Sequence, residues 1–260
     1  MISLLLLVFL TIFISPIVVS YHPSLTIQCD DDNFSIVNSS SDTIKLFNHV
    51  HQLVLEDFPL ERIPDILSNI QPKVTQISSL ILKRMKHHPL KTFPNHYQCS
   101  SNLQSVVRVK LCGTPASAAG HYSAVLAYLS QCTSVGDLEI LDTSLRQVMR
   151  LQESGETLQS LRLTNNHIAE LQLESFSGLS KLRVLDLGSN KLVRIPSGVF
   201  RSNRRLRRLY LAKNVISFIT RQSFLGKINL YIHCLFLSSY FTVSIVLTTS
   251  VYICFNLYIR

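Results

Sequence analysis

The sequence predicts an α/β solenoid of about seven turns, in which short parallel strands stack into one sheet. Two observations lead to this fold class. A motif of leucines, one asparagine and one phenylalanine recurs at 24-residue intervals toward the end of the chain. Before it, pairs of apolar residues separated by one position recur at wider intervals. Self-similarity at a fixed period is typical of repeat proteins, whose turns each bury an apolar face against their neighbours.

The motif is clearest in three copies, 158–181, 182–205 and 206–227, which follow the pattern LxxLxLxxNxIxxIxxxxFxxxxx. Because side chains alternate along a strand, both residues of each LxL pair point into the core. The asparagine lies just after the strand, where its amide can bond backbone groups that have left the sheet. We expect the phenylalanines to stack as a spine. The repeat-structural residues are Asn166, Asn190, Asn214, Phe176, Phe200 and Phe224.

The LxL pair extends the array backwards, so that it covers 50–227. The earlier pairs are Leu53/Leu55, Leu80/Leu82, Val107/Val109 and Leu138/Ile140. The strand intervals are then 27, 27, 31, 23, 24 and 24 residues. The longest interval contains "TPASAAGHYSAVLAYLSQC", in which Thr114 can cap a helix and Pro115 suits its first position. We expect that helix to pack opposite the strands.

This pattern resembles the extracellular leucine-rich repeat, in the 24-residue form typical of Toll-like receptors, Slit-type guidance proteins and small leucine-rich proteoglycans. The resemblance implies a right-handed horseshoe with a parallel concave sheet and an irregular or short-helical convex side. It also implies a non-enzymatic module that binds an extracellular protein ligand on its concave face. Two features depart from the family: only Cys29 precedes the first strand, and no cysteine-bearing cap is recognisable after Phe224.

Residues that flank the last LxL pairs are the candidates for ligand contact on the concave face. They are Arg162, Asn165, Arg183, Asp186, Arg207, Arg208, Tyr210 and Lys213. Equivalent positions earlier in the array include acidic residues, so the sequence predicts a change from acidic to basic along the face. Such a change would orient a polar partner. Tyr210 among arginines has the composition of a contact hot spot.

The net charge of +9 originates in one region, because ten basic residues and one acidic residue lie between Lys181 and Lys213. The basic patch Arg201, Arg204 and Arg205 is part of it. A basic run attracts acidic partners such as sulfated glycans, although it also serves as a solvated surface. The alternative functions are therefore a secreted matrix-type structural protein that binds sulfated glycans through its basic turns, or a truncated receptor fragment.

No motif for catalysis is present. The sequence contains neither GxSxG nor a Gly-rich phosphate loop, and its histidine pairs lack partners at metal-site spacing. We therefore predict no enzyme activity, no cofactor and no metal site. Nucleic acid is not an expected partner.

The start of the chain is typical of a secreted protein. Residues 1–20 form an apolar run that ends in small residues, as in a signal peptide, with an uncleaved signal anchor as the alternative. Residues 21–49 form an N-terminal cap segment. Sequons at Asn33 and Asn38 predict glycosylation. The disulfide candidates, which allow three pairings, are Cys29, Cys99, Cys112 and Cys132.

The segment 228–260 differs in character from the repeats. From Ile228 to Ile259 it has 32 residues without a charge, and about 20 are enough to span a bilayer. It is a candidate transmembrane segment, which would make the protein a single-pass membrane-anchored receptor or adhesion protein. The alternative is a non-native read-through of non-coding sequence, because the motif stops after Lys227. The predicted location is extracellular, either anchored or secreted.

Overall fold

The computed structural model of the chain describes thirteen stretches. They are 24–30, 33–37, 47–70, 74–86, 99, 101–113, 119–148, 151, 157–217, 219, 221–224, 230–234 and 251–255. The predicted signal peptide and Asn38 lie outside the described residues.

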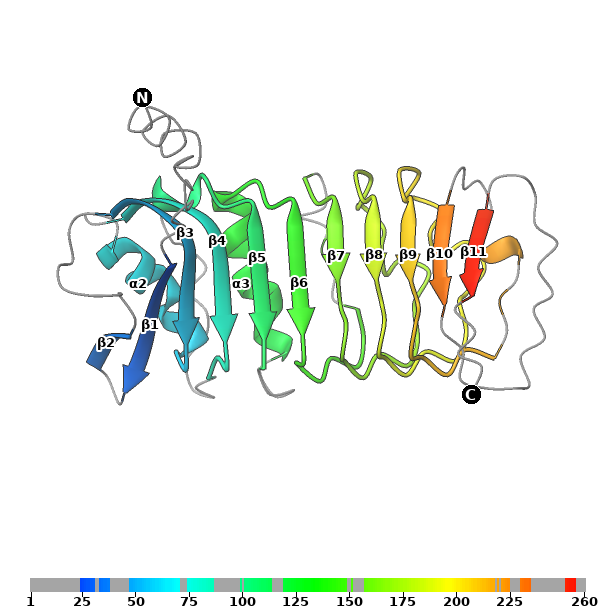
Figure 1. Cartoon of the computed structure of the whole chain (residues 1–260), viewed down its shortest axis with the longest axis horizontal. Coiled ribbons are helices and arrows are strands. Elements are labelled where there is room, and N and C mark those ends of the chain that lie inside the picture. Colours follow the sequence, from blue (N-terminus) through cyan, green and yellow to red (C-terminus); the bar gives the residue numbers. More distant parts are fainter. Residues whose placement is uncertain are drawn as a thin grey trace, which may run out of the picture.

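One sheet of eleven strands runs along the molecule in the order β11-β10-β9-β8-β7-β6-β5-β4-β3-β1-β2 (Figure 1). All neighbours pair in parallel except β1 and β2, which are antiparallel. The strands are β1 Ser24–Asp30, β2 Asn33–Val37, β3 Phe47–Glu56, β4 Val74–Lys83, β5 Arg108–Cys112, β6 Asp137–Leu141, β7 Ser160–Arg162, β8 Val184–Asp186, β9 Arg208–Tyr210, β10 Leu230–Cys234 and β11 Val251–Phe255. This open parallel sheet confirms the predicted solenoid and is consistent with a horseshoe.

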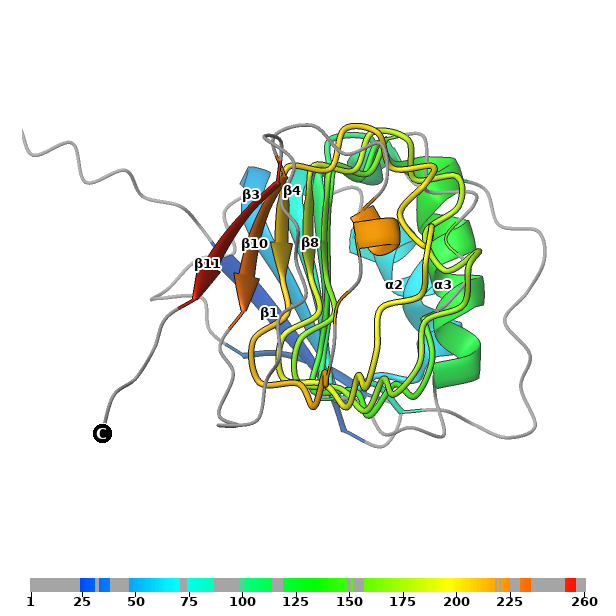
Figure 2. The same cartoon turned by 90° about the vertical axis from the view of Figure 1, so that its right-hand side faces the viewer.

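The chain returns from strand to strand on one side of the sheet, where the helices also lie (Figure 2). The α-helices are α2 Ile63–Ile70 and α3 Ala119–Cys132, and the 3-10 helices are η1 Leu60–Arg62, η2 Ser101–Leu103 and η4 Arg221–Phe224. The expected helix is α3, which buries Val125, Leu126 and Leu129 in the core. Its predicted start at Thr114 and Pro115 lies outside the described residues.

Helix α2 follows β3 and contains a proline near its start. Pro64 is the second residue of the helix, where the missing N–H has no intrahelical partner to lose. The buried Ile63, Ile66 and Leu67 have the spacing of one helical face. The proline therefore begins a helix at this position.

The third turn has a different register from the predicted one. Val109 lies opposite Leu80 and Leu138, so the intervals on both sides are 29 residues instead of 27 and 31. Val109 and Leu111 are fully buried, whereas Val107 is 54% exposed. The predicted pair Val107/Val109 was wrong because three alternating apolar residues offer two registers, and the core uses the second.

Each turn from β3 to β9 bends through a residue with a positive φ angle, four positions after the first residue of the buried apolar pair in its strand. These left-handed residues are Asp57, Arg84, Gly113, Asp142, Asn165, Ser189 and Lys213, with φ between 46° and 68°. The N–H groups of five of them donate to carbonyls of the next turn; for example, the Gly113 N–H donates to the Leu141 carbonyl at 3.2 Å. Only Gly, Asn and Asp adopt this conformation readily. The bend thus belongs to the fold and not to one residue type.

The asparagines that follow β7, β8 and β9 form a ladder between turns. The Asn190 Nδ2 donates to the Leu163 carbonyl of the turn before at 2.8 Å and to Leu187 of its own turn at 3.0 Å. The Asn190 Oδ1 accepts from the Ile168 N–H at 3.1 Å. Asn166 and Asn214 make equivalent bonds. Each asparagine therefore ties its own bend to the preceding turn.

Phenylalanines on the opposite side stack as a column. The Phe176 and Phe200 rings are 5.6 Å apart between centroids, and the Phe200 and Phe224 rings 6.0 Å. Asn203, which the sequence pattern did not single out, is fully buried beside them and donates to the Phe176 carbonyl at 2.8 Å. The last turns are thus fixed at both the bend and the column.

The two ends extend further than the predicted array 50–227. At the N-terminal end, β1 continues the parallel sheet next to β3, and the hairpin to β2 ends it. At the other end, β10 places Ile232 opposite Leu209, and both Leu230 and Ile232 are fully buried. The sequence interpretation ended the array at Lys227, so it missed this strand, in which Ile232 follows Leu209 by 23 residues.

Cysteine pairing is partly described. Cys99 and Cys132 form a disulfide with Cα atoms 5.2 Å apart, and Cys112 is a free thiol on β5. Cys29 lies on β1, where side chains are outside the described features. No helix in the described part of the chain has the length and apolar character needed to cross a bilayer.

Candidate functional site

The side of the sheet that faces away from the helices presents its residues in rows (Figure 2). We call this side the open face; it corresponds to the predicted concave face. The first row is Gln52, Ser79, Arg108, Asp137, Ser160, Val184, Arg208 and Tyr231. The second row is Val54, Ile81, Lys110, Glu139, Arg162, Asp186, Tyr210 and His233. Neighbours within a row are about 4.8 Å apart, the spacing of strands.

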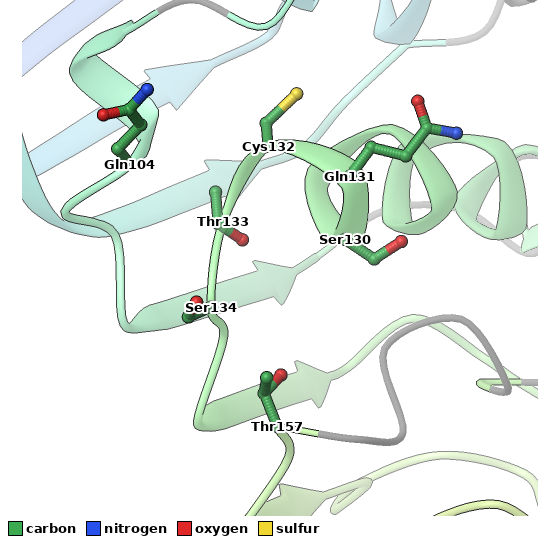
Figure 3. A pocket seen from close by; sticks show the side chains of 7 residues that line it. All are labelled: Gln104, Ser130, Gln131, Cys132, Thr133, Ser134 and Thr157. Carbon is green, nitrogen blue, oxygen red and sulfur yellow. The ribbon is translucent and has the colours of Figure 1, made fainter.

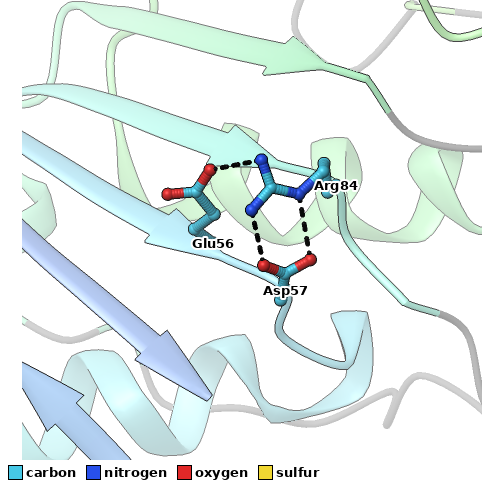
Figure 4. Close-up of polar contacts among 3 residues, drawn as sticks. All are labelled: Glu56, Asp57 and Arg84. Atoms are coloured by element: carbon cyan, nitrogen blue, oxygen red, sulfur yellow. Dashed lines mark hydrogen bonds and ion pairs between the residues drawn. The ribbon is translucent and has the colours of Figure 1, made fainter. Parts of the chain in front are cut away.

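An arginine fork holds two acidic residues at the β3 and β4 end of the open face (Figure 4). Arg84 donates from Nε to Asp57 Oδ1 at 3.1 Å and from Nη2 to Oδ2 at 2.7 Å. Its Nη1 also lies 2.7 Å from Glu56 Oε1. These hydrogen bonds lower the pKa of Asp57, against a smaller opposing effect of burial. The single cation therefore offsets one of the two anionic charges, and the three residues together keep a net negative charge.

Ion pairs continue across the middle of the open face. In the first row, Arg108 Nη2 lies 3.6 Å from Asp137 Oδ2. In the second row, Glu139 is shared, because Lys110 Nζ lies 3.5 Å from Oε2 and Arg162 Nη1 contacts Oε1. The predicted change from acidic to basic is therefore absent in this part of the face, where each acidic residue is paired with a base on an adjacent strand.

The face changes at β8 and β9. Asp186 is half-buried, and its Oδ1 accepts from the Gly188 N–H at 2.9 Å. Burial raises the pKa of Asp186, partly opposed by this bond and by Arg162. Arg208 is exposed, and in its row it stands between Val184 and Tyr231. It makes no ion pair with any residue in the described part of the chain.

The structure brings only some of the predicted contact residues onto the open face. Arg162, Asp186, Arg208 and Tyr210 lie on it in adjacent strands. Asn165 and Lys213 are the exposed left-handed residues that follow β7 and β9. Arg183 and Arg207 precede β8 and β9 at the rim of the sheet, where the Arg207 N–H donates to the Arg183 carbonyl at 2.8 Å.

The predicted basic patch lies outside the open face. Arg201, Arg204 and Arg205 are exposed in the turn between the phenylalanine column and β9. Lys181 occupies the position of Arg205 one turn earlier and is also exposed. The patch therefore continues into the rim formed by Arg183 and Arg207.

Tyr231 is an open-face residue that the sequence interpretation missed. It is 46% exposed and follows Arg208 in the first row. Its signal was the alternation of Leu230, Tyr231 and Ile232, which was assigned to the hydrophobic tail instead of a strand.

A shallow cavity of about 410 Å³ lies where α3 meets the turn into β6 (Figure 3). Its lining is polar but uncharged, and Cys132 there belongs to the disulfide. The lining residues are Gln104, Ser130, Gln131, Cys132, Thr133, Ser134 and Thr157. The cavity offers hydrogen-bonding groups without an acid or base, and it is a weaker candidate site than the open face.

A family model described as "Leucine rich repeat" matches residues 156–216. These residues contain β7 to β9, the asparagine ladder and most of the phenylalanine column. Over residues 156–216 the chain therefore matches the leucine-rich repeat. The match agrees with the parallel sheet and its periodic core.

Known leucine-rich repeat proteins are similar to larger parts of the chain. Human leucine-rich repeats and immunoglobulin-like domains protein 1 is 33% identical over 102 residues, which are 37% of this chain and 9% of that protein. Mouse podocan-like protein 1 is 26% identical over 180 residues, 68% of this chain and 29% of that protein. The chain thus spans less than a third of the length of these relatives.

A solved structure has the same fold. A chain in the glycosylated Toll–Spatzle complex of Drosophila superposes with a TM-score of 0.55 at 15% identity, covering 82% of this chain and 31% of that one. At this identity the likeness supports the leucine-rich repeat solenoid alone.

Proposed function

We propose that this leucine-rich repeat chain is a non-enzymatic binding module of an extracellular protein, and that it recognises a protein ligand on the open face. The main support is that the described helices and return loops all lie on the other side of the sheet. The open face therefore presents two rows of side chains, most of them polar or aromatic, on a rigid scaffold. A rigid surface loses little conformational entropy on binding.

An engineered glycan on the open face tests this proposal. Arg162→Asn creates a sequon at positions 162–164, because Thr164 is already present. The protein, secreted from glycosylating cells, is first screened against purified extracellular domains, and binders are then tested with the variant. We expect the glycan to abolish binding, since it stands in the middle of the second row.

Two matched variants interpret the result. Leu173→Asn creates a sequon with Ser175 at a residue that is 60% exposed in a return loop, and its glycan should leave binding intact. Arg162→Gln removes the same charge without adding a glycan. Binding that survives an occupied sequon at 162 would overturn the proposal.

A second candidate function is binding of sulfated glycans by the basic patch. It is supported by the exposure of Arg201, Arg204 and Arg205 together in one turn. The triple replacement by serine should lower the salt concentration that elutes the protein from heparin. The variant has three fewer cations to attract the polyanion, so less salt is needed to screen that attraction. Unchanged elution would remove this candidate.

We also propose that the protein enters the secretory pathway and is glycosylated at Asn33, which begins strand β2. Anchoring by residues 228–259 as one apolar helix conflicts with the pairing of Leu230–Cys234 and Val251–Phe255 as strands of the sheet. Alkaline carbonate extraction separates the two states. Release into the supernatant is expected when β10 and β11 are part of the solenoid, and retention with the membrane supports the anchor.

A further inference from the structure

The open face has two parts that differ in whether their charges are neutralised within the protein. From β3 to β7, the cations Arg84, Arg108, Lys110 and Arg162 are each within 4 Å of a carboxylate on an adjacent strand or bend. A ligand carboxylate would have to compete with a carboxylate that is already in place. Binding there would gain little, because exchange of one ion pair for another leaves the net interaction nearly unchanged.

From β8 to β10 the neutralisation ends. Arg208 has Val184 on one side and Tyr231 on the other, so neither neighbour in its row carries a negative charge. Asp186 is the nearest acidic position, in the second row beside Tyr210. Its Oδ1 bonds the Gly188 N–H beyond the strand end, on the side away from the first row. The Arg208 guanidinium is therefore left available to a ligand.

The surroundings of Arg208 favour a protein segment over a simple anion. Tyr210 lies two residues further on the same face, and Tyr231 lies one strand away. Tyrosine and arginine are the residue types that dominate binding energy in protein interfaces. Arg183 at the rim and Lys181 and Arg205 in the basic turns add positive potential nearby without entering the face. That potential would speed the encounter with an acidic partner.

We propose that Arg208, Tyr210 and Tyr231, at the β8 to β10 end of the open face, form the binding hot spot, and that it takes an extended acidic segment of a partner protein. This inference rests on the proposed function and adds where on the open face the ligand binds and what chemistry it has. The two tyrosines pack against the segment, and the Arg208 guanidinium binds one of the carboxylates of the segment. The paired cations Arg84, Arg108, Lys110 and Arg162 contribute little.

The test uses a fluorescein-labelled decaglutamate peptide and measures its binding to the secreted chain by fluorescence anisotropy at low salt. Arg208→Gln should weaken binding about tenfold, which corresponds to about 1.4 kcal/mol. Tyr231→Ala should weaken it by a similar factor. Tyr231→Phe should retain most of the affinity, because it keeps the ring that packs on the peptide.

The matched control is Arg108→Gln, because Arg108 occupies the same row on β5 but is paired with Asp137. We expect less than about a twofold change, in line with a contribution near zero for an exposed paired residue. Equal losses at Arg108 and Arg208 would overturn the hot spot in favour of diffuse attraction. Absence of decaglutamate binding would overturn the acidic partner. Circular dichroism verifies folding of each variant.

Two outcomes separate this inference from its alternatives. For any protein ligand found by the screen, the loss of binding caused by Arg208→Gln is compared with the loss caused by the glycan at position 162. Loss of that ligand with the glycan but not with Arg208→Gln would leave the proposed function standing and overturn the hot spot. Heparin that competes for Arg208 in preference to the Arg201, Arg204 and Arg205 patch would assign the site to a sulfated glycan and equally overturn it.

Discussion

The turns of β3 to β6 and those of β7 to β9 build the same sheet in two different ways. The first group has strands of 10, 10, 5 and 5 residues, and α2 and α3 lie in its return segments. The second group has strands of 3 residues, with the asparagine ladder and the phenylalanine column in place of helices. The parallel sheet therefore does not require one kind of return.

The difference teaches how each group satisfies its backbone. A helix bonds the N–H and C=O groups of its interior, so a helical return needs side-chain partners only at its ends. One example is the Asn102 Nδ2, which donates to the Leu67 carbonyl in the last turn of α2 at 3.1 Å. A loop without regular structure must find other partners for groups that are buried. Asparagine supplies both a donor and an acceptor and serves this need in the second group. The repeat motif in the sequence therefore indicates turns that return to the sheet through a loop without an α-helix.

Thr143 marks the junction between the two groups. It occupies the asparagine position after β6 and is fully buried, and its N–H and hydroxyl both donate to Asn166 Oδ1, at 3.1 and 2.9 Å. Thr143 therefore donates hydrogen bonds to the next turn, but its hydroxyl does not join two turns in the way that each asparagine amide does.

The largest expected effect is on the phenylalanine column. Phe200→Ala removes a fully buried ring that stacks between two others, and such a change destabilises a fold by about 4 kcal/mol. Urea unfolding followed by circular dichroism measures the loss. Val193→Ala, at a residue 50% exposed in the same turn, is the control and should change little. A loss at Phe200 below about 1 kcal/mol would mean that the column does not hold these turns.

The asparagine ladder should come next. Asn190→Ala leaves the Leu163 and Leu187 carbonyls and the Ile168 N–H without their side-chain partner, and we expect about 3 kcal/mol of destabilisation from these buried groups. Thr143→Ala removes one hydroxyl bond and should lose only about 1 kcal/mol. The same unfolding measurement compares them. Equal losses would contradict the distinction between the ladder and its first member.

A smaller effect is expected at the left-handed bends, in either direction. Gly113→Val introduces a branched side chain at φ 68°, which should destabilise the fold by about 1–2 kcal/mol. Lys213→Asn replaces a residue poorly suited to φ 57° by one that tolerates it, and it should stabilise by up to about 1 kcal/mol. Thermal unfolding of both variants tests the pair. Opposite signs are expected, and a loss of stability in Lys213→Asn would contradict this explanation.

The smallest effects concern two aspartates with opposite pH dependence. Arg84 lowers the pKa of Asp57, so its ionised form stabilises the fold above the ordinary aspartate range, and this is lost as pH falls through the lowered value. Burial raises the pKa of Asp186, so its ionised form destabilises the fold at neutral pH, and that effect disappears below the ordinary value.

Asparagine substitutions separate the two cases. Asp57→Asn should reduce the free energy of unfolding at neutral pH, whereas Asp186→Asn should increase it slightly while keeping an acceptor for the Gly188 N–H. Both differences should vanish in strongly acidic solution, where the aspartates are protonated in folded and unfolded chains. Measuring thermal midpoints across the pH range checks this, and equal signs at neutral pH would refute it.

The loop-type turns could be predicted from the sequence, and the helical turns only in part. Asn190 and Phe200 recur at one spacing because each copy needs the same side chain at the same place. In the third turn the choice between Val107 and Leu111 depends on where the left-handed bend falls, and Gly113 was the available signal. Tyr231 was missed because no charged residue follows Lys227 until Arg260, so the alternation of a strand could not be distinguished from a continuous apolar segment. The contacts of Glu139 with Lys110 and Arg162 depend on the register of three strands, which the sequence pattern alone did not give.

The left-handed bend occurs once per turn at a constant distance from its strand, so the strand side of every turn has the same length. Variation in turn length, from 23 residues between Leu138 and Leu161 to 29 between Leu80 and Val109, is taken up entirely on the helical and loop side. The pitch of the open face is unaffected by it. Addition or removal of a whole turn would therefore move a binding surface along the solenoid in fixed steps without changing the spacing between its rows.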